Sequence, residues 1–291
     1  MNILPEPLEL SAPLARRLAP QLCRKDPATG EDCSWYHGFW QYLRLMELAV
    51  TPADHADFYH RAFQSVTGGS GAARVLVSGT TDYSMLAHVL AICRERGLEP
   101  VLTVVDKCDT SLFLNRWYAE RESASVECSR ADILEYVSAT PFDAVCTDNF
   151  LGQFSLDERT RLLTKWRELL RPGGRVITVT RVRATADTAQ IGFSPEKAEA
   201  LRATVLRKAA SMPAWLHADP AAMAHAADIY VNRLRTWPVR SREEVQQLFE
   251  RCGFRVDELS DAPRAAAAGE RPEGPAVPGS GEQVRIIAPR L

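Results

Sequence analysis

The stretch ARVLVSGTTDYSMLAHVLAICRERG, residues 73–97, decides the fold of this chain. Residues 73–79 form a short apolar run rich in β-branched side chains, which predicts a buried strand. Residues 83–97 carry apolar side chains at helical spacing and end at Gly97, which predicts an amphipathic helix closed by a glycine. The stretch is therefore one strand followed directly by one helix.

The same alternation continues after this stretch. Further strands are predicted at residues 100–106, 125–132, 142–149 and 174–182. A helical segment follows each of the first three strands, at 111–122, 133–137 and 157–170 respectively. Parallel strands need crossover connections, so five strands separated by helices predict a doubly wound, mostly parallel sheet. The predicted class is α/β, with a core over residues 71–183.

Helical segments flank this core. Residues 1–70 have helical patterning, with Thr51 as an N-cap and Pro52 at the first helical position, and predict an N-terminal helical cap. Residues 184–240 are alanine-rich and helical, and they interrupt the alternation. We interpret them as a helical insertion near the substrate site.

Residues 241–291 return to the core. Their first helix begins with Ser241 and Glu244 at capping-box spacing. Two final strands, at 255–259 and 283–289, and a mobile loop rich in Pro, Gly and Ala between them, at 263–282, are predicted to complete the region.

Composition and charge exclude several classes of protein. Hydrophobic residues make up 46% and charged residues 25% of the chain, which is typical of a globular enzyme. Thirty-five basic and 37 acidic side chains create no field that would attract nucleic acid or a membrane surface. Residues 1–18 lack the basic-then-apolar order that we would expect of a signal peptide, and no apolar run approaches the ~20 residues of a membrane span. We therefore expect a cytoplasmic enzyme with a small-molecule substrate; the sequence leaves the oligomeric state open.

The seven cysteines are expected to be reduced and structural. Their number is odd, and they show no CxxC or Cys/His metal spacing, so no metal site is predicted. Most lie among apolar residues, as small buried hydrophobic side chains do. They are Cys23, Cys33, Cys93, Cys108, Cys128, Cys146 and Cys252.

The residues that end the predicted strands carry the chemistry, because open parallel sheets bind ligands outside the carboxyl ends of their strands. Asp106 is placed to accept hydrogen bonds from both hydroxyls of a ribose. Asp132, beside the apolar Ile133, suits the donor amine of adenine. Gly79 lets the backbone approach a ligand closely. Together these residues predict a nucleoside cofactor.

At this point the chain resembles class I S-adenosylmethionine-dependent methyltransferases, over roughly residues 71–183 and 241–291. The segments that carry the resemblance are VLVSGTTDYSML (75–86), VVDKCDTSLFLNRWYA (104–119), SRADILEY (129–136), FDAVCTDNF (142–150) and, most specific, KWRELLRPGGRVITVT (165–180). The resemblance implies a Rossmann-like, seven-stranded sheet with an antiparallel last strand, and S-adenosylmethionine as cofactor.

The resemblance also implies a set of cofactor-binding residues. Gly79 would lie under the methionine part, Asp106 would bind ribose, and Asp148 would face the reacting sulfonium. The full set is Ser78, Gly79, Thr80, Asp82, Tyr83, Asp106, Lys107, Asp132, Ile133 and Asp148.

The first motif departs from the family pattern. Val77 stands where members usually carry an acidic residue, and Thr81 and Tyr83 stand where they carry further glycines. Asp82 is the candidate replacement for the missing carboxylate.

Three residues are candidates for catalysis by in-line methyl transfer to oxygen, nitrogen or carbon. Asn149 can orient the nucleophile through its amide, His37 can act as a base, and Tyr36 can present an aromatic face to the sulfonium. The structural alternatives are packing of the cap for Tyr36 and His37, and a turn for Asn149.

Other functions use the same fold. Without an acidic partner at Val77, the methionine ammonium would have a lower pKa and could attack its own side chain, as in enzymes like azetidine-2-carboxylate synthase, releasing methylthioadenosine. A non-enzymatic protein that binds S-adenosylmethionine is a more remote alternative. An NAD(P) dehydrogenase is disfavoured because the turn reads GTTDYS in place of GxGxxG.

Overall fold

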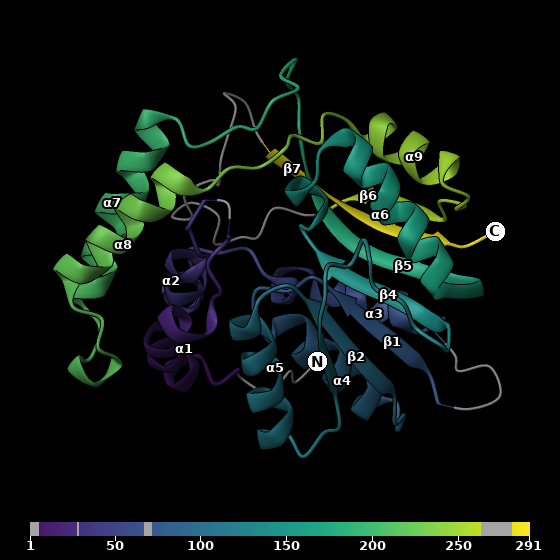
Figure 1. Cartoon of the computed structure of the whole chain (residues 1–291), viewed down its shortest axis with the longest axis horizontal. Coiled ribbons are helices and arrows are strands. Elements are labelled where there is room, and N and C mark those ends of the chain that lie inside the picture. The colour runs from purple at the N-terminus through teal and green to yellow at the C-terminus, as the bar shows by residue number, and fades with distance from the viewer. Residues whose placement is uncertain (1–5, 28, 67–71, 263–280) are drawn as a thin grey trace.

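The structure is a computed structural model that describes residues 6–27, 29–66, 72–262 and 281–291. Its centre is a seven-stranded sheet with the order β3-β2-β1-β4-β5-β7-β6 (Figure 1). The strands are β1 (Arg74–Ser78), β2 (Val101–Asp106), β3 (Glu127–Arg130), β4 (Phe142–Asp148), β5 (Leu170–Arg183), β6 (Glu258–Asp261) and β7 (Gly281–Pro289). Neighbouring strands from β3 to β5 pair in parallel, whereas β7 is antiparallel to both β5 and β6. The predicted fold class is confirmed.

The sheet reverses its winding between β1 and β4. From β1 the chain builds outward through β2 to β3, and it then returns to the other side of β1 to form β4. This reversal leaves a crevice beyond the carboxyl ends of β1 and β4, which is where open α/β sheets bind ligands.

Helices cover both faces of the sheet. One face packs on α3 (Ala56–Phe63), α4 (Ser84–Glu95) and α5 (Asp109–Arg121). The other face packs on α6 (Leu156–Leu169) and α9 (Arg242–Arg251). The strand side chains alternate between these two cores: Val75 and Val77 belong to the first, and Leu76 belongs to the second.

A third apolar core joins the N-terminal helices to the insertion at one side of the sheet (Figure 1). Its helices are α1 (Leu8–Leu22), α2 (Ser34–Leu45), α7 (Pro195–Ala210), η3 (Ala214–Leu216) and α8 (Pro220–Arg233). The Tyr42 hydroxyl donates a hydrogen bond to the Leu216 carbonyl at 2.6 Å, a contact between segments 174 residues apart. The helix that follows α2 in the chain is η1 (Pro52–His55). As predicted, Thr51 is its N-cap and Pro52 is its first residue.

Three local predictions need correction. Residues 133–137 form a turn and not a helix, because the Asp132 carboxylate accepts a hydrogen bond from the Leu134 N–H at 2.9 Å. A segment of five residues is also too short to form a stable helix by itself. The strand expected at 255–259 is β6, which begins three residues later than predicted, at Glu258.

The capping box at Ser241 is half formed. The Ser241 hydroxyl accepts from the Glu244 N–H at 3.0 Å, but the Glu244 carboxylate accepts from the N–H and the guanidinium of Arg240.

The loop predicted at 263–282 falls almost wholly outside the described residues. In the part of the chain that the structure describes, none of the helices has the length and apolar character needed to cross a bilayer.

Candidate functional site

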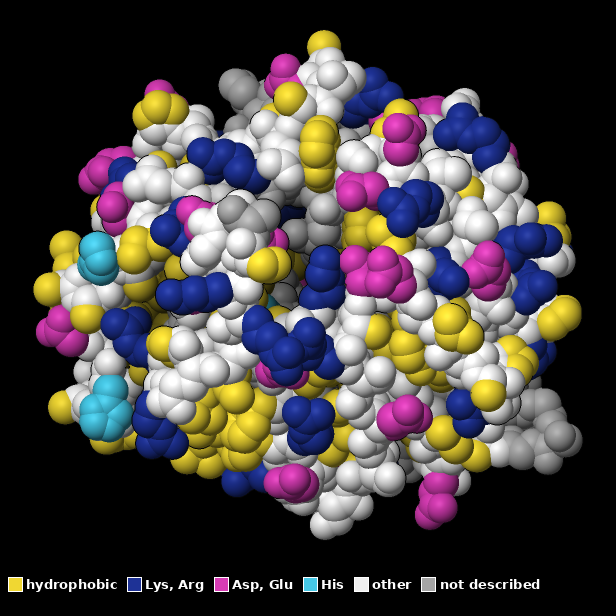
Figure 2. Space-filling view, in the orientation of Figure 1, with side chains coloured by type: hydrophobic (Ala, Val, Ile, Leu, Met, Phe, Trp, Pro, Cys, Tyr) yellow, Lys and Arg dark blue, Asp and Glu magenta, His cyan; other side chains and the backbone are white. Residues whose placement is uncertain are grey.

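A cavity of about 520 Å³ lies at the carboxyl ends of β1, β2 and β4. The strand ends form one wall, the cap forms a second, and residues of the insertion, Arg233 and Arg235 among them, form a third. The face of the molecule drawn in Figure 2 is hollowed near its centre, and Lys and Arg side chains surround the hollow. The volume lies within the ~300–1,000 Å³ typical of small-ligand sites.

Asp106 ends β2 and lines the cavity. One carboxylate oxygen accepts from the Thr80 N–H at 2.9 Å, and the other accepts from the Cys108 N–H at 2.8 Å. Burial raises the pKa of Asp106 to about 6, although these backbone donors and the charge of His37 act in the opposite direction. Two backbone bonds therefore fix the carboxylate and leave it further lone pairs for a ligand.

Asp148 ends β4 on the opposite side of β1 and also lines the cavity. It accepts hydrogen bonds from the Tyr59 hydroxyl at 2.9 Å and from the Asn149 amide. Burial raises its pKa to about 7, against the effect of these two donors. A carboxyl group with this pKa can change its charge near neutral pH.

Asn149 lies at the same strand end with a left-handed backbone, φ = 51°. Its N–H donates to the Val179 carbonyl at 2.8 Å, which fixes the backbone. Among the described residues, its side-chain oxygen is buried and has no hydrogen-bond partner. A buried acceptor without a donor is costly, so this atom is ready to accept a hydrogen bond from a ligand.

Gly79 lies at the end of β1, with φ = 67°. A Cβ atom at this position would lie 2.3 Å from the Phe150 ring, so only glycine fits. Phe150 packs edge-to-face on Phe154 with ring centroids 4.9 Å apart, and it contacts the apolar core that contains Ile133.

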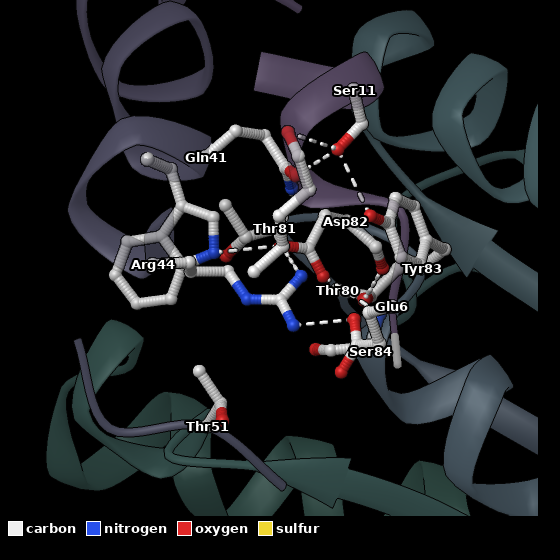
Figure 3. Close-up of polar contacts among 12 residues, drawn as sticks. Glu6, Ser11, Gln41, Arg44, Thr51, Thr80, Thr81, Asp82, Tyr83 and Ser84 are labelled. Carbon is white, nitrogen blue, oxygen red and sulfur yellow. Dashed lines mark hydrogen bonds and ion pairs between the residues drawn. The ribbon is translucent and has the colours of Figure 1, made fainter. Parts of the chain in front are cut away.

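Asp82 does not line the cavity. It is 1% exposed, and one of its oxygens accepts from the Trp40 indole N–H at 2.9 Å and the Arg44 guanidinium at 2.8 Å (Figure 3). The same oxygen accepts from the Gln41 amide, and the other accepts from the Ser84 N–H. Asp82 thus joins the cap to the core and does not stand where a replacement for the missing first-motif carboxylate would face a ligand.

The other predicted cofactor residues divide into two groups. Four of them line the cavity: Gly79, Thr80, Asp106 and Asp148. The cavity lining does not include Ser78, Tyr83, Lys107, Asp132 or Ile133, nor does it include Asp82. Ser78 and Tyr83 are fully buried, where Ser78 accepts from the Trp166 indole and the Tyr83 hydroxyl bonds with Ser11. Lys107 and Asp132 form an ion pair with a distance of 3.1 Å near the surface.

Tyr36 and His37, from the cap, both line the cavity. The Tyr36 hydroxyl lies 3.2 Å from the Thr81 hydroxyl, and its ring stacks on Tyr230 of the insertion with centroids 6.0 Å apart. His37 Nδ1 lies 3.3 Å from the Thr81 carbonyl oxygen. Burial lowers the pKa of His37, but interactions with Cys108 and Cys33 outweigh burial, so the net shift is upward.

A second cavity, of about 160 Å³, lies beside the first. Tyr36, Trp40 and Asn149 line both cavities, and Phe193 and Tyr230 add aromatic walls to the second. Asn149 therefore stands at the junction of a large cavity and a small aromatic one.

The cysteines depart from the expectation of isolated hydrophobic residues. The Cys23, Cys33 and Cys108 sulfurs all lie within 4.8 Å of one another, next to His37. The missed signal is the spacing of Cys33 and His37, four residues apart at the start of α2, which puts both on one helical face. No sequence pattern linked them to Cys23 or Cys108.

Comparison with protein-family models and with curated proteins finds no match to this sequence. Solved structures do share its fold. The S-adenosylmethionine-dependent methyltransferase SibL, in its apo form, matches with a TM-score of 0.50 and 14% identity, over 99% of this chain and 70% of that protein. Magnesium protoporphyrin IX methyltransferase (ChlM) from Synechocystis PCC 6803, solved with bound SAH, matches with a TM-score of 0.50 and 12% identity, over 87% of this chain and 88% of that protein.

The pyocyanin biosynthetic protein PhzM matches with a TM-score of 0.49 and 18% identity, over 91% of this chain. The match spans 63% of PhzM, less than two thirds of its length. At these identities the matches to SibL and ChlM show a shared fold.

Proposed function

We propose that this protein, whose fold is that of the class I S-adenosylmethionine-dependent methyltransferases, transfers a methyl group from S-adenosylmethionine to a small molecule. The observation that carries the proposal is the half-buried Asp106 carboxylate, fixed at the end of β2 in a cavity of sufficient size. One carboxylate at this place can accept both hydroxyls of a ribose through charge-assisted hydrogen bonds.

Other cavity residues suit the rest of the cofactor. Gly79 leaves its backbone free of a side chain, and the carboxylate of Asp148 can face positively charged groups. We keep adenine binding by Asp132 and Ile133 as part of the proposal. It requires the Phe150 ring to move from its place on Gly79, because neither residue lines the cavity now.

The smaller cavity suits the methyl acceptor. Its volume of about 160 Å³ and its aromatic walls fit a molecule with one ring, since a cavity of about 150 Å³ can hold benzene. S-adenosylmethionine supplies an activated methyl group, so orientation by Asn149 and exclusion of water by the cap supply much of the catalysis. A strong base is then optional.

Calorimetry with S-adenosylmethionine and S-adenosylhomocysteine tests the proposal. Asp106→Ala loses bonds to two hydroxyls and should weaken binding of both ligands about tenfold or more, given ~1.5–3 kcal/mol per charge-assisted bond. The exposed Asp157→Ala is the control and should bind as the unmodified protein does. Equal affinities for the two variants would exclude this placement of the ribose.

Mass spectrometry then identifies the reaction. Incubation with S-adenosylmethionine and a set of small aromatic acceptors should yield S-adenosylhomocysteine. Methylthioadenosine from S-adenosylmethionine alone would instead identify the internal cyclase, and binding without any product would identify a non-enzymatic protein.

A further inference from the structure

Three cysteine side chains from distant parts of the chain meet where the cap joins the core. The Cys23 and Cys33 sulfurs each lie 3.5 Å from the Cys108 sulfur, and all three sulfurs are within 4.8 Å of one another. In a tetrahedral zinc site with Zn–S bonds of about 2.3 Å, the sulfurs are about 3.8 Å apart. The thiols therefore already stand close to the spacing that one zinc ion imposes.

His37 lies beside this cluster, although its ring nitrogens do not lie within 4.8 Å of all three sulfurs. Its Nδ1 faces the Thr81 carbonyl oxygen at 3.3 Å, and because a carbonyl oxygen can only accept, Nδ1 carries the proton. A metal ion would displace any second proton from the ring, which leaves the Nε2 lone pair for coordination. Metal-bound histidines commonly donate their other ring N–H to a carbonyl or carboxylate in this manner.

The surroundings of the cluster also favour a metal site. Cys23, Cys108 and His37 are each at most 7% exposed, whereas Cys33 is half-buried and lines the larger cavity. The Thr110 hydroxyl lies 3.1 Å from the Cys23 sulfur and can donate a hydrogen bond to a thiolate there. A disulfide, by contrast, would use two of the three sulfurs and leave the third without a role.

We propose that Cys23, Cys33 and Cys108 bind one Zn²⁺ ion through their thiolates, and that the neighbouring His37 ring turns toward the ion to complete a closed Cys₃His site. Four protein ligands leave no open position for a substrate, which is typical of structural zinc. Zinc would take no part in the proposed methyl transfer, although Cys33 and His37 also line the larger cavity, and zinc can be measured without S-adenosylmethionine.

The ion would tie three segments together. Cys23 follows α1, Cys33 and His37 begin α2, and Cys108 precedes α5, two residues after Asp106. Zinc would thus fix the loop that presents Asp106 and hold the cap against it. Removal of zinc should loosen the cap while the sheet, which contains none of the ligands, stays folded.

Elemental analysis of the full chain, purified without chelator under reducing conditions, tests the proposal. We expect one zinc per chain, and loss of most of it in Cys108→Ser. Cys128→Ser is the matched control, a half-buried cysteine outside the cluster, and should keep one zinc per chain. Full zinc in Cys108→Ser, or no zinc in the unmodified protein even after zinc is added, would overturn the proposal.

Cobalt provides a measurement that does not depend on the folding of a variant. Co²⁺ added to the metal-free, unmodified protein should give the thiolate charge-transfer and strong visible bands of tetrahedral coordination, and one equivalent of Zn²⁺ should abolish them. His37→Ala should alter the visible bands and weaken Co²⁺ binding. Absence of thiolate bands, or a Cys33–Cys108 or Cys23–Cys108 disulfide in the freshly purified protein, would contradict a zinc site.

Discussion

Asn149 has a left-handed backbone, and this affects how its proposed role can be tested. Asn149→Ala would add strain of ~1–2 kcal/mol at a positive φ, whereas Asn149→Gly removes the amide and tolerates the backbone. If the amide aligns the acceptor, Asn149→Gly should lower kcat about tenfold and leave cofactor affinity and Tm nearly unchanged, because the lost interaction belongs to the transition state.

Steady-state kinetics, calorimetry and thermal melting of the same preparation separate the possibilities for Asn149. Unchanged kcat with a lower Tm would assign the residue to the turn alone.

Asp148 allows a test by pH. Its pKa of about 7 in the folded protein lies above the ordinary value of 3.8, because burial disfavours the charged form. Between these two pH values the folded state holds a proton that the unfolded state releases, so this group's contribution to the free energy of unfolding falls as pH rises. Asp148→Asn should therefore be more stable, relative to the unmodified protein, at pH ~8 than at pH ~4.

Urea unfolding at the two pH values measures this difference. Asp157→Asn, at an exposed position of α6, is the control. A difference for Asp148→Asn that is the same at both pH values would contradict a raised pKa.

Some site residues could be predicted from the sequence and others could not. Asp106 and Asp148 could be found because each ends an apolar strand, and the ends of parallel strands meet at one edge of a sheet. The burial of Asp82 could not be predicted, because its partners Trp40, Gln41 and Arg44 come from a helix whose docking depends on tertiary packing.

At the scale of elements, three residues of α2 donate hydrogen bonds to the buried carboxylate of Asp82. The Arg44 guanidinium, which is buried, bridges Asp82 and Glu6. Asp82→Ala leaves it with one carboxylate and removes the acceptor of Trp40 and Gln41. We expect a loss of about 3–5 kcal/mol in the free energy of unfolding, since several donors lose their acceptor and each buried donor left without one costs ~1–3 kcal/mol.

Urea unfolding of Asp82→Ala measures this loss, and Asp109→Ala is the control. Asp109 pairs with the exposed Arg24 at 3.0 Å, and such pairs contribute about 1 kcal/mol or less. Equal losses in the two variants would show that Asp82 adds no more than a surface ion pair.

Element positions could be predicted where the periodicity of apolar residues is long and regular, as in α4 and β1. The prediction of a helix at 133–137 was wrong. Five residues carry too little periodicity to outweigh the hydrogen bond by which the Asp132 side chain favours a turn.

At the scale of the whole molecule, the cavity combines parts that the sheet alone does not supply. The Tyr36 ring of the cap stacks on Tyr230 of the insertion, and both line the smaller cavity together with Asn149 at the end of β4. The sequence predicts a cap and an insertion, but it does not show that they share one apolar core, because docking between distant helices leaves no local pattern.

The position of β7 has a consequence for the synthesis of the chain. This strand is made after the other six, yet it lies between β5 and β6. Until residues 281–289 leave the ribosome, β5 and β6 each present backbone groups without a partner strand on the side that β7 will occupy. The nascent protein therefore passes through a stage with two open strand edges, in which chaperones or other nascent chains can pair with the sheet before its own last strand arrives.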